Sequence, residues 1–384
     1  MDRSSLTSHA GVIAAVAFGL IVTNVAPAVI GGLIAGAHVS ETVAANLITA
    51  EWLAIAISSL ILSTRIQFVS LRTLGVAGLV LAGSAQLACT AFEPVGTNAL
   101  LCFYGLRILT GLGEGMLLCA ANASLAHVAD PARAYAIATI VAGLLAAAFL
   151  AAVPTLQARW PAAGFALLAG FALLALPLLN RLGKSAALNE RGGGDSTRSL
   201  GAPAKLGLGA VFMFSVALGA LWSFSEVIGT RLGLARPQAD HVLALNLLAG
   251  LVGGAGVAAL NDRWGYLVPV VLSMTCLAVT AVVLGMTLRI PIYVATQLGY
   301  GLAYPVALSF LMAAIAKMDR SGRLVGASGG VILLGFALGP SLAGYVVTAA
   351  GVRLLGVCVG TALILSLGCI IAALTSERAA TLNA

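Results

Sequence analysis

The feature that most constrains this chain is a series of long apolar runs separated by short polar stretches. About 20 consecutive apolar residues cross the hydrocarbon core of a bilayer as a helix, and a helix satisfies its own backbone groups where lipid offers no partner. Because 60% of the residues are hydrophobic and only 9% are charged, a water-soluble core could not enclose the apolar surface. We therefore predict an all-α integral membrane protein with twelve transmembrane helices.

Twelve runs have the length of a spanning helix. The predicted spans are residues 11–36, 43–63, 74–92, 99–126, 134–156, 162–182, 206–229, 242–260, 267–288, 290–316, 325–349 and 352–375. The first run is too long for the apolar part of a cleavable signal peptide and lacks a convincing cleavage site. We therefore expect it to remain as the first helix.

The longest polar interruption divides the chain into two sets of six helices. It carries three consecutive glycines from Gly192 and several charges, which is typical of a flexible linker. We predict an N-terminal six-helix half (1–183), a cytoplasmic linker (184–205) and a C-terminal six-helix half (206–384). The loops after the fourth and tenth predicted helices carry the same charge signs at equivalent places, which indicates an internal pseudo-symmetric repeat: Asp130-Pro-Ala-Arg133 and Asp319-Arg-Ser-Gly-Arg323.

The distribution of Lys and Arg predicts the orientation of the helices. Of the twenty Lys and Arg residues, fourteen fall on the side of the N-terminus and five on the opposite side, and Arg107 lies within a predicted helix. We expect both termini and the linker to be cytoplasmic, in a multi-pass protein of the bacterial inner membrane. The net charge of +7 follows from this topology signal, so we expect no binding of nucleic acid.

Several classes of function are excluded by features that the sequence lacks. The six cysteines lie in apolar runs without CxxC spacing or a nearby His, so neither a disulfide framework nor a metal site is indicated. There is no G-x-x-x-x-G-K-[ST] loop for ATP-driven pumping, no selectivity-filter repeat for a channel and no large receptor domain. We expect no enzymatic activity and no cofactor, and a monomer surrounded by membrane lipid.

Two motifs resemble those of the major facilitator superfamily. After the eighth predicted helix, Asn261-Asp262-Arg263-Trp264-Gly265 resembles the cytoplasmic loop signature of that family, in which Asp-Arg-x-Gly forms a tight turn and charge pairs between helices. In the fourth helix, Arg107-Ile-Leu-Thr-Gly111-Leu-Gly113-Glu114-Gly115 resembles the intramembrane Arg-x-x-x-Gly pattern, especially that of organic-anion transporters. The equivalent loop of the first half, from Ser63 to Gln67, departs from the signature because Thr64 replaces the acid.

The resemblance covers nearly the whole chain and implies a secondary transporter of the major facilitator fold that works by alternating access. It also implies a conformational latch formed by residues of the loops that join the helices: Asp262, Arg263, Gly265, Asp130, Arg133, Asp319 and Arg323. The antiporter signature that ends in Gly-Pro is missing from residues 134–156, which are rich in alanine, so drug–proton antiport is disfavoured.

Four ionisable residues fall inside predicted helices, where a charge costs several kcal/mol unless it is paired or hydrated: Glu51, Arg107, Glu114 and Glu226. Arg107 and Glu114 share a face of one helix, about 10 Å apart along its axis. Arg107 could hold a substrate carboxylate, with Glu51, Glu114 and Glu226 as proton carriers. Alternatively, Arg107 and Glu51 form a structural ion pair, the Gly-Glu-Gly around Glu114 serves helix contact, and Glu226 reaches the outer water.

Polar and aromatic residues form a second group of candidates for substrate binding. Gln297, Tyr300 and Tyr304 recur at helical spacing in an otherwise apolar helix, which indicates either a pathway lining or hydrogen-bonded packing against the predicted helix at 325–349. Trp222 shares a face with Glu226, so it could form an aromatic wall or belong to the interfacial belt. Asn24 and Asn246 are further polar candidates within helices.

We therefore expect proton-coupled symport of a small organic anion by alternating access, with protons and a small-molecule substrate as the partners. The single intramembrane Arg107 favours an anion. Because three intramembrane acids accompany this one base, the alternative is proton-driven efflux of drug-like cationic or neutral amphiphiles.

Overall fold

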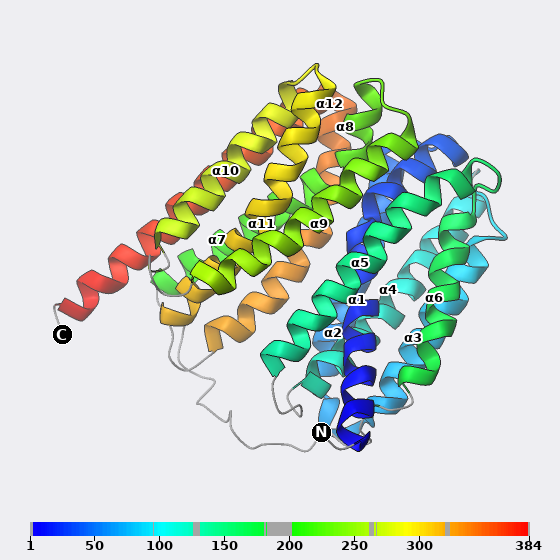
Figure 1. The fold of residues 1–384 in the computed structure, drawn as a ribbon, viewed down its shortest axis with the longest axis horizontal. Helices are drawn as coiled ribbons and strands as arrows, with labels where there is room; N and C mark the ends of the chain where they lie inside the picture. Colours follow the sequence, from blue (N-terminus) through cyan, green and yellow to red (C-terminus); the bar gives the residue numbers. More distant parts are fainter. Residues whose placement is uncertain are drawn as a thin grey trace. The chain divides into compact units, whose positions relative to one another are not determined.

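Helices make up nearly all of the chain in the computed structural model, which describes residues 3–94, 96–125, 131–179, 182, 202–260, 265, 267–318 and 323–382. Figure 1 shows these elements in order along the chain. They are α1 (Arg3–Ala37), α2 (Glu41–Ser63), the short 3-10 helix η1 (Ile66–Phe68), α3 (Leu71–Cys89), α4 (Thr97–Leu125), α5 (Pro131–Gln157), α6 (Ala163–Leu179), α7 (Ala202–Ser223), α8 (Ser225–Arg231), α9 (Arg236–Leu260), α10 (Leu267–Met286), α11 (Ile290–Met318) and α12 (Arg323–Leu382).

The predicted spans are found as helices. Within the described residues, ten helical segments are long and apolar enough to cross a membrane, and Ala163–Leu179 is a shorter apolar helix. One of the ten segments, Ser328–Ser376, contains both of the last two predicted spans. The predicted span at 206–229 is not continuous, because Phe224 (φ −100°, ψ 4°) leaves the helical conformation and separates α7 from α8.

The long helix α12 consists of two arms that meet at Gly351. This glycine has φ 78° and ψ 179°, a conformation that residues with a Cβ rarely adopt. Gly335 in the first arm lies against Ser215, and Ser366 in the second arm donates a hydrogen bond to the carbonyl of Ala210 at 2.7 Å. A straight helix would separate Gly335 and Ser366 by about 46 Å, whereas Ala210 and Ser215 are about 7.5 Å apart along α7. The chain therefore reverses at Gly351 (Figure 1).

Serines begin two of the helices by satisfying backbone donors that a helix leaves free. Ser40 accepts a hydrogen bond from the backbone N–H of Val43, and Ser70 accepts one from Thr73, both at 3.3 Å. Such caps supply partners for the first N–H groups, which have none inside the helix. These caps fix the first residues of α2 and α3.

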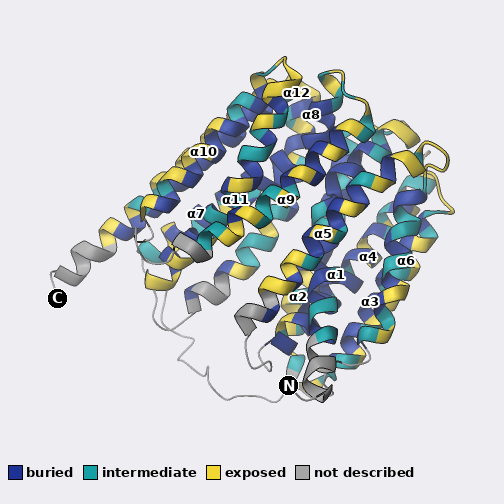
Figure 2. Ribbon diagram, viewed as in Figure 1, coloured by how far each residue is buried: buried dark blue, intermediate teal, exposed yellow. Residues whose placement is uncertain are grey.

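The helices form two compact units, Met1–Asn189 and Glu190–Ala384. In the first unit, α4 packs against α1, α2 and α3, while α1 also packs against α5 and α3 against α6. In the second unit, α12 packs against α7 and α10, and α11 packs against α9 and α10. Large apolar side chains such as Leu101, Leu173 and Leu174 are exposed along the helices, and Figure 2 shows exposed positions on many of the helices. Exposed leucines of this number are expected where lipid is the solvent.

Glycines let α4 approach its neighbours backbone to backbone. A Cβ added to Gly113 would lie 2.5 Å from the carbonyl oxygen of Gly78 in α3, and one added to Gly115 would lie 2.5 Å from the carbonyl oxygen of Ile55 in α2. Small residues at such positions are typical of helix contacts inside membranes. Because Gly113 and Gly115 flank Glu114, they bring the neighbouring helices close to this acid.

Candidate functional site

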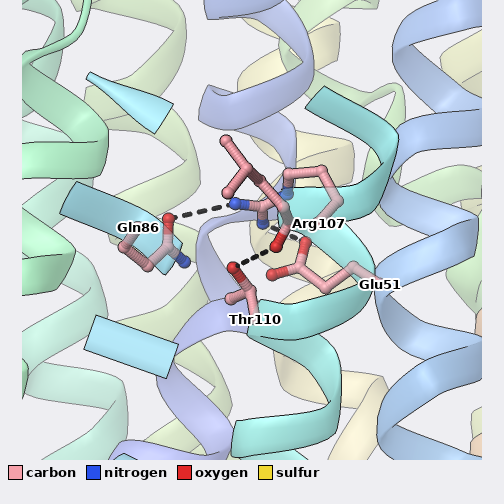
Figure 3. Close-up of polar contacts among 5 residues, drawn as sticks. Glu51, Gln86, Arg107 and Thr110 are labelled. Carbon is pink, nitrogen blue, oxygen red and sulfur yellow. Dashed lines mark hydrogen bonds and ion pairs between the residues drawn. The ribbon is translucent and has the colours of Figure 1, made fainter. Parts of the chain in front are cut away.

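A buried ion pair joins α2 to α4 in the first unit. Arg107 of α4 and Glu51 of α2 have no solvent-exposed side-chain surface, and the Nη2 of Arg107 forms an ion pair with the Oε2 of Glu51. The Nη1 of Arg107 donates a hydrogen bond to the Oε1 of Gln86 in α3 at 3.0 Å. Figure 3 shows the guanidinium between these two partners. The guanidinium carbon also lies 5.4 Å from the centre of the Phe165 ring in α6, a cation–π contact.

Glu114 is the second acid of this group and lies beside Gln86. It is 5% exposed, lines the same small cavity as Gln86, and interacts electrostatically with Glu51 and Arg107. Thr110 lies between Arg107 and Glu114 in α4 and donates its hydroxyl to the carbonyl of Leu106 at 2.9 Å. We call Glu51, Gln86, Arg107 and Glu114 the Arg107 cluster.

A cavity of about 10 Å³ in the first unit is lined by two members of the Arg107 cluster, Gln86 and Glu114, and is close to the size that holds one water molecule. A cavity of about 120 Å³ is lined by Phe103, Phe165 and Cys89, together with residues of α1, α5 and the start of α6. It contains no residue of the cluster, but the Phe165 ring that lines it contacts Arg107. Water-sized space therefore adjoins Glu114, the acid that is not paired with Arg107.

The charges of the cluster do not balance when every group is ionised. Two carboxylates face one guanidinium, which leaves a formal charge of −1 among apolar helices. An uncompensated charge in such surroundings costs several kcal/mol, and a carboxyl group removes it by binding a proton. The cluster can therefore remove its excess negative charge by binding one proton.

Three aromatic rings of the second unit are stacked in a row. The rings of Trp222 in α7 and Tyr300 in α11 are nearly parallel, with centres 6.4 Å apart and an angle of 9°. Tyr300 and Tyr304 are also 6.4 Å apart, at 11°. Trp222 and Tyr300 are buried, whereas Tyr304 is partly exposed. We call these three side chains the aromatic row; it ends on a ring that can be reached from outside the unit.

Gln297 and Asn246 bind each other and join α11 to α9. The side-chain nitrogen of Asn246 donates hydrogen bonds to the backbone oxygen of Gln297 at 2.7 Å and to its Oε1 at 3.0 Å. Both side chains are buried. The sequence suggested packing as an alternative for Gln297, and the partner in the structure is α9.

Glu226 lies at the start of α8 and is buried, with 1% of its side chain exposed. It does not reach outer water, so that alternative is wrong. Instead, the Nε of Arg236 in α9 donates a hydrogen bond to the Oε1 of Glu226 at 2.7 Å. Because Arg236 is 23% exposed, this ion pair lies between the interior of the unit and its surface.

A comparison with protein-family models matches most of the chain. The matching model is described as Major Facilitator Superfamily and covers residues 11–288. The chain belongs to the major facilitator superfamily. It is therefore a secondary transporter and not an enzyme, which confirms the resemblance and the class of function predicted from the sequence.

Solved structures of transporters support the major facilitator fold. The nucleoside transporter NupG has a TM-score of 0.73 at 12% identity, over 97% of this chain and 99% of that chain. The human organic anion transporter MFSD10 (TETRAN) gives 0.67 at 15% identity, over 96% and 100%. An inward-facing, occupied bacterial homolog to the human lysosomal transporter Spinster gives 0.68 at 15% identity, over 97% and 96%. No curated protein sequence matches this chain.

The latch residues expected of a major facilitator transporter are mostly beyond the described structure. Asp130, Asp262, Arg263 and Asp319 lie outside the described residues, and so do the side chains of Arg133 and Arg323, which belong to the first turns of α5 and α12. Gly265 is described and has φ 61°, the left-handed conformation that suits glycine in a tight turn. Asn24, the remaining candidate, lies half-buried in α1.

Two residues of these sites were missed by reasoning from the sequence. Gln86 was not singled out, although a long amide side chain inside an apolar span is itself a signal of a buried polar contact. Asp240 was not singled out as a candidate, although the structure buries it completely in α9. It lies four residues after Arg236, on the same face of a helix, but its burial depends on contacts distant in sequence.

Glu51 and Arg107 neutralise each other, so removing one of the two charges leaves the other buried without a partner. Such a change should destabilise the protein more than removing both charges together. We expect Arg107→Gln to lower the free energy of unfolding by about 3–5 kcal/mol, as when other buried pairs are broken. Glu51→Gln should also destabilise, and the double variant should lose less than the sum of the two. Denaturant unfolding of the purified proteins measures the cycle, with the exposed Glu93→Gln as control. Strictly additive losses would contradict a direct ion pair.

Proposed function

We propose that this transporter carries a small organic anion across the membrane together with a proton, by alternating access. One observation carries the proposal: the buried guanidinium of Arg107 is paired with Glu51, and a second buried acid, Glu114, lies close enough to interact electrostatically with both. Arginine keeps its charge at physiological pH, whereas a carboxyl group can gain and lose a proton. The two acids are therefore the groups of this cluster that respond to protons.

Protonation of Glu51 would release Arg107 for substrate. A neutral carboxyl group no longer forms an ion pair, and the freed guanidinium can bind a carboxylate through two parallel N–H···O bonds. An anion adds one negative charge to the cluster and a proton removes one, so binding of one favours binding of the other. Glu114 would be the second proton site, because it is buried in the same cluster and lines a small cavity together with Gln86.

The aromatic row suggests that the solute has an aromatic or other planar part. A ring that stacks on another ring gains about 0.5–1.5 kcal/mol beyond the burial of its area. We propose that Trp222, Tyr300 and Tyr304 contact this part of the solute and that Asn24 contacts a polar part. Asn246 and Gln297 would act through the helices, because their hydrogen bonds fix α11, which carries both tyrosines, against α9.

Similar structures do not decide the substrate. Two of them are named as a nucleoside transporter and an organic anion transporter, and they are 12% and 15% identical to this chain. Identity at this level supports the fold alone, so the proposed anion depends on Arg107 and not on these relatives.

Proton-driven efflux of a cationic or neutral amphiphile is the second candidate. It is favoured by the fact that Glu51, Gln86 and Phe165 already surround the guanidinium of Arg107 within the first unit. In that case the cluster would bind only protons, and the aromatic row would bind the solute without help from Arg107.

A ligand screen with two variants separates the candidates. A ligand that binds only the folded state stabilises it by about 2.7 kcal/mol at a hundredfold excess over its Kd. We expect aromatic carboxylates to raise the thermal stability of the wild type, and to do so more strongly in Glu51→Gln, because Arg107 is then free. The charge-neutral double variant Glu51→Gln/Arg107→Gln should lose this stabilisation. Matched amides, amphiphilic cations and neutral sugars serve as control ligands.

The opposite pattern of the screen would favour efflux. Stabilisation by cations or neutral amphiphiles alone, with the same size in the wild type and the double variant, would contradict an anion carrier. Transport of the hits into proteoliposomes, with and without a pH gradient, then tests whether protons drive the flux.

We also propose that the protein lies in the bacterial inner membrane with both termini in the cytoplasm. The excess of Lys and Arg in the loops on the side of the N-terminus supports this orientation. Fusions of a reporter to the C-terminus and into residues 184–205 should show cytoplasmic activity at both places. Periplasmic activity at either place would contradict the orientation.

A further inference from the structure

A second group of buried acids lies in the second unit, where α8 and α9 meet. Asp240 of α9 has no exposed surface and Glu226 of α8 is 1% exposed. Arg236, which binds Glu226, lies one helical turn before Asp240 on the same face of α9, so the two carboxyl groups lie near each other and interact electrostatically. Two ionised carboxylates in such contact repel each other strongly, so such pairs normally hold one proton between them.

The hydrogen-bond donors around this pair are too few for two carboxylates. Arg236 donates to the Oε1 of Glu226 at 2.7 Å. The Oε2 of Glu226 and both Oδ atoms of Asp240 are buried and have no donor among the described residues. The nearby hydroxyl of Tyr293 in α11 donates instead to the backbone carbonyl of Ser225 at 2.9 Å. A donor is therefore missing at the place where the two acids face each other.

The surrounding charges do not compensate for the second acid. Arg236 supplies one positive charge, and Tyr293 faces the pair from α11 as a neutral hydroxyl. On α7, the described lysine Lys205 lies near the opposite end of the helix. Further basic side chains of the described elements that pack nearby are exposed: Arg231, His241, Arg289 and Arg353. A formal charge of −1 is left inside the unit when both acids are ionised.

We propose that Glu226 and Asp240 share one proton and form a proton-binding site in the second unit. The shared proton supplies the missing donor, and its loss leaves two adjacent carboxylates that push α8 away from α9. Glu226 lies four residues after Trp222, across the helix break at Phe224, so this movement acts on the chain next to the aromatic row. The role of this site in transport rests on the proposed proton coupling. The occupation of the site by a proton does not depend on that proposal.

Infrared difference spectroscopy of the purified full-length protein tests the site, because a protonated carboxyl group has a carbonyl band that a carboxylate lacks. At neutral pH and without sodium, we expect one such band of the wild type to be lost in Asp240→Asn, while any band of the Arg107 cluster stays unchanged. The same single band should be lost in Glu226→Gln, because the remaining acid then has a neutral amide as its donor. The exposed Glu93→Gln is the control and should keep the band.

Two results would overturn the proposal. A spectrum that is the same in the wild type and in both folded variants would mean that neither acid holds a proton. A band that sodium removes at constant pH would identify a monovalent cation, and not a proton, as the ligand. Thermal unfolding checks that each variant is folded. The measurement needs no transport. The shared proton can therefore be found even if proton-coupled anion uptake is not, and proton-coupled uptake can be found even if the shared proton is not.

Discussion

The charge of Arg107 must be balanced inside an apolar bundle of helices, and much of the first unit is arranged around this need. A guanidinium does not lose its proton, so it requires an anion and acceptors from its neighbours. Glu51 supplies the anion from α2, Gln86 supplies an acceptor from α3, and Phe165 supplies a ring face from α6. Close contact of α4 with α2 and α3 at its glycines brings these partners within reach. The packing that stabilises the unit therefore also builds the cluster that we propose to bind protons.

The two units place similar charges in different arrangements. The first has Glu51 and Glu114 with Arg107, and the second has Glu226 and Asp240 with Arg236, so each contains two buried acids and one arginine. The first arginine is fully buried, whereas Arg236 is partly exposed. Each group has a formal charge of −1 when both of its acids are ionised, and binding one proton makes it neutral. We infer that each half of the transporter can respond to protons separately, with Trp222 of the aromatic row four residues before Glu226 of the second site.

The spans of the helices could be predicted from the sequence because hydrophobic length decides them. The break at Phe224 could not, since an aromatic residue in an apolar run gives no sign of leaving the helical conformation. The sequence predicted a boundary between two helices at residues 349–352, and the chain reverses its direction there at Gly351. The ionisable residues Glu51, Arg107 and Glu114 were recognised by their cost in a membrane, and the pairing of Glu51 with Arg107 was one of two readings. The hydrogen bond from Arg107 to Gln86 and the burial of Asp240 depend on which helices pack against each other. The spacing of residues along one helix does not contain that information.

Coupled binding of a proton at Glu51 and a substrate anion at Arg107 is the central claim of this account, and proton uptake on anion binding tests it most directly. A carboxylate selected by its stabilising effect is added to the purified protein in weakly buffered solution, and the change in pH is recorded against the amount bound. We predict uptake of about one proton per carboxylate by the wild type, since binding and protonation are linked. We predict none by Glu51→Gln, although that variant should still bind the carboxylate. Binding by the wild type without proton uptake would contradict the account.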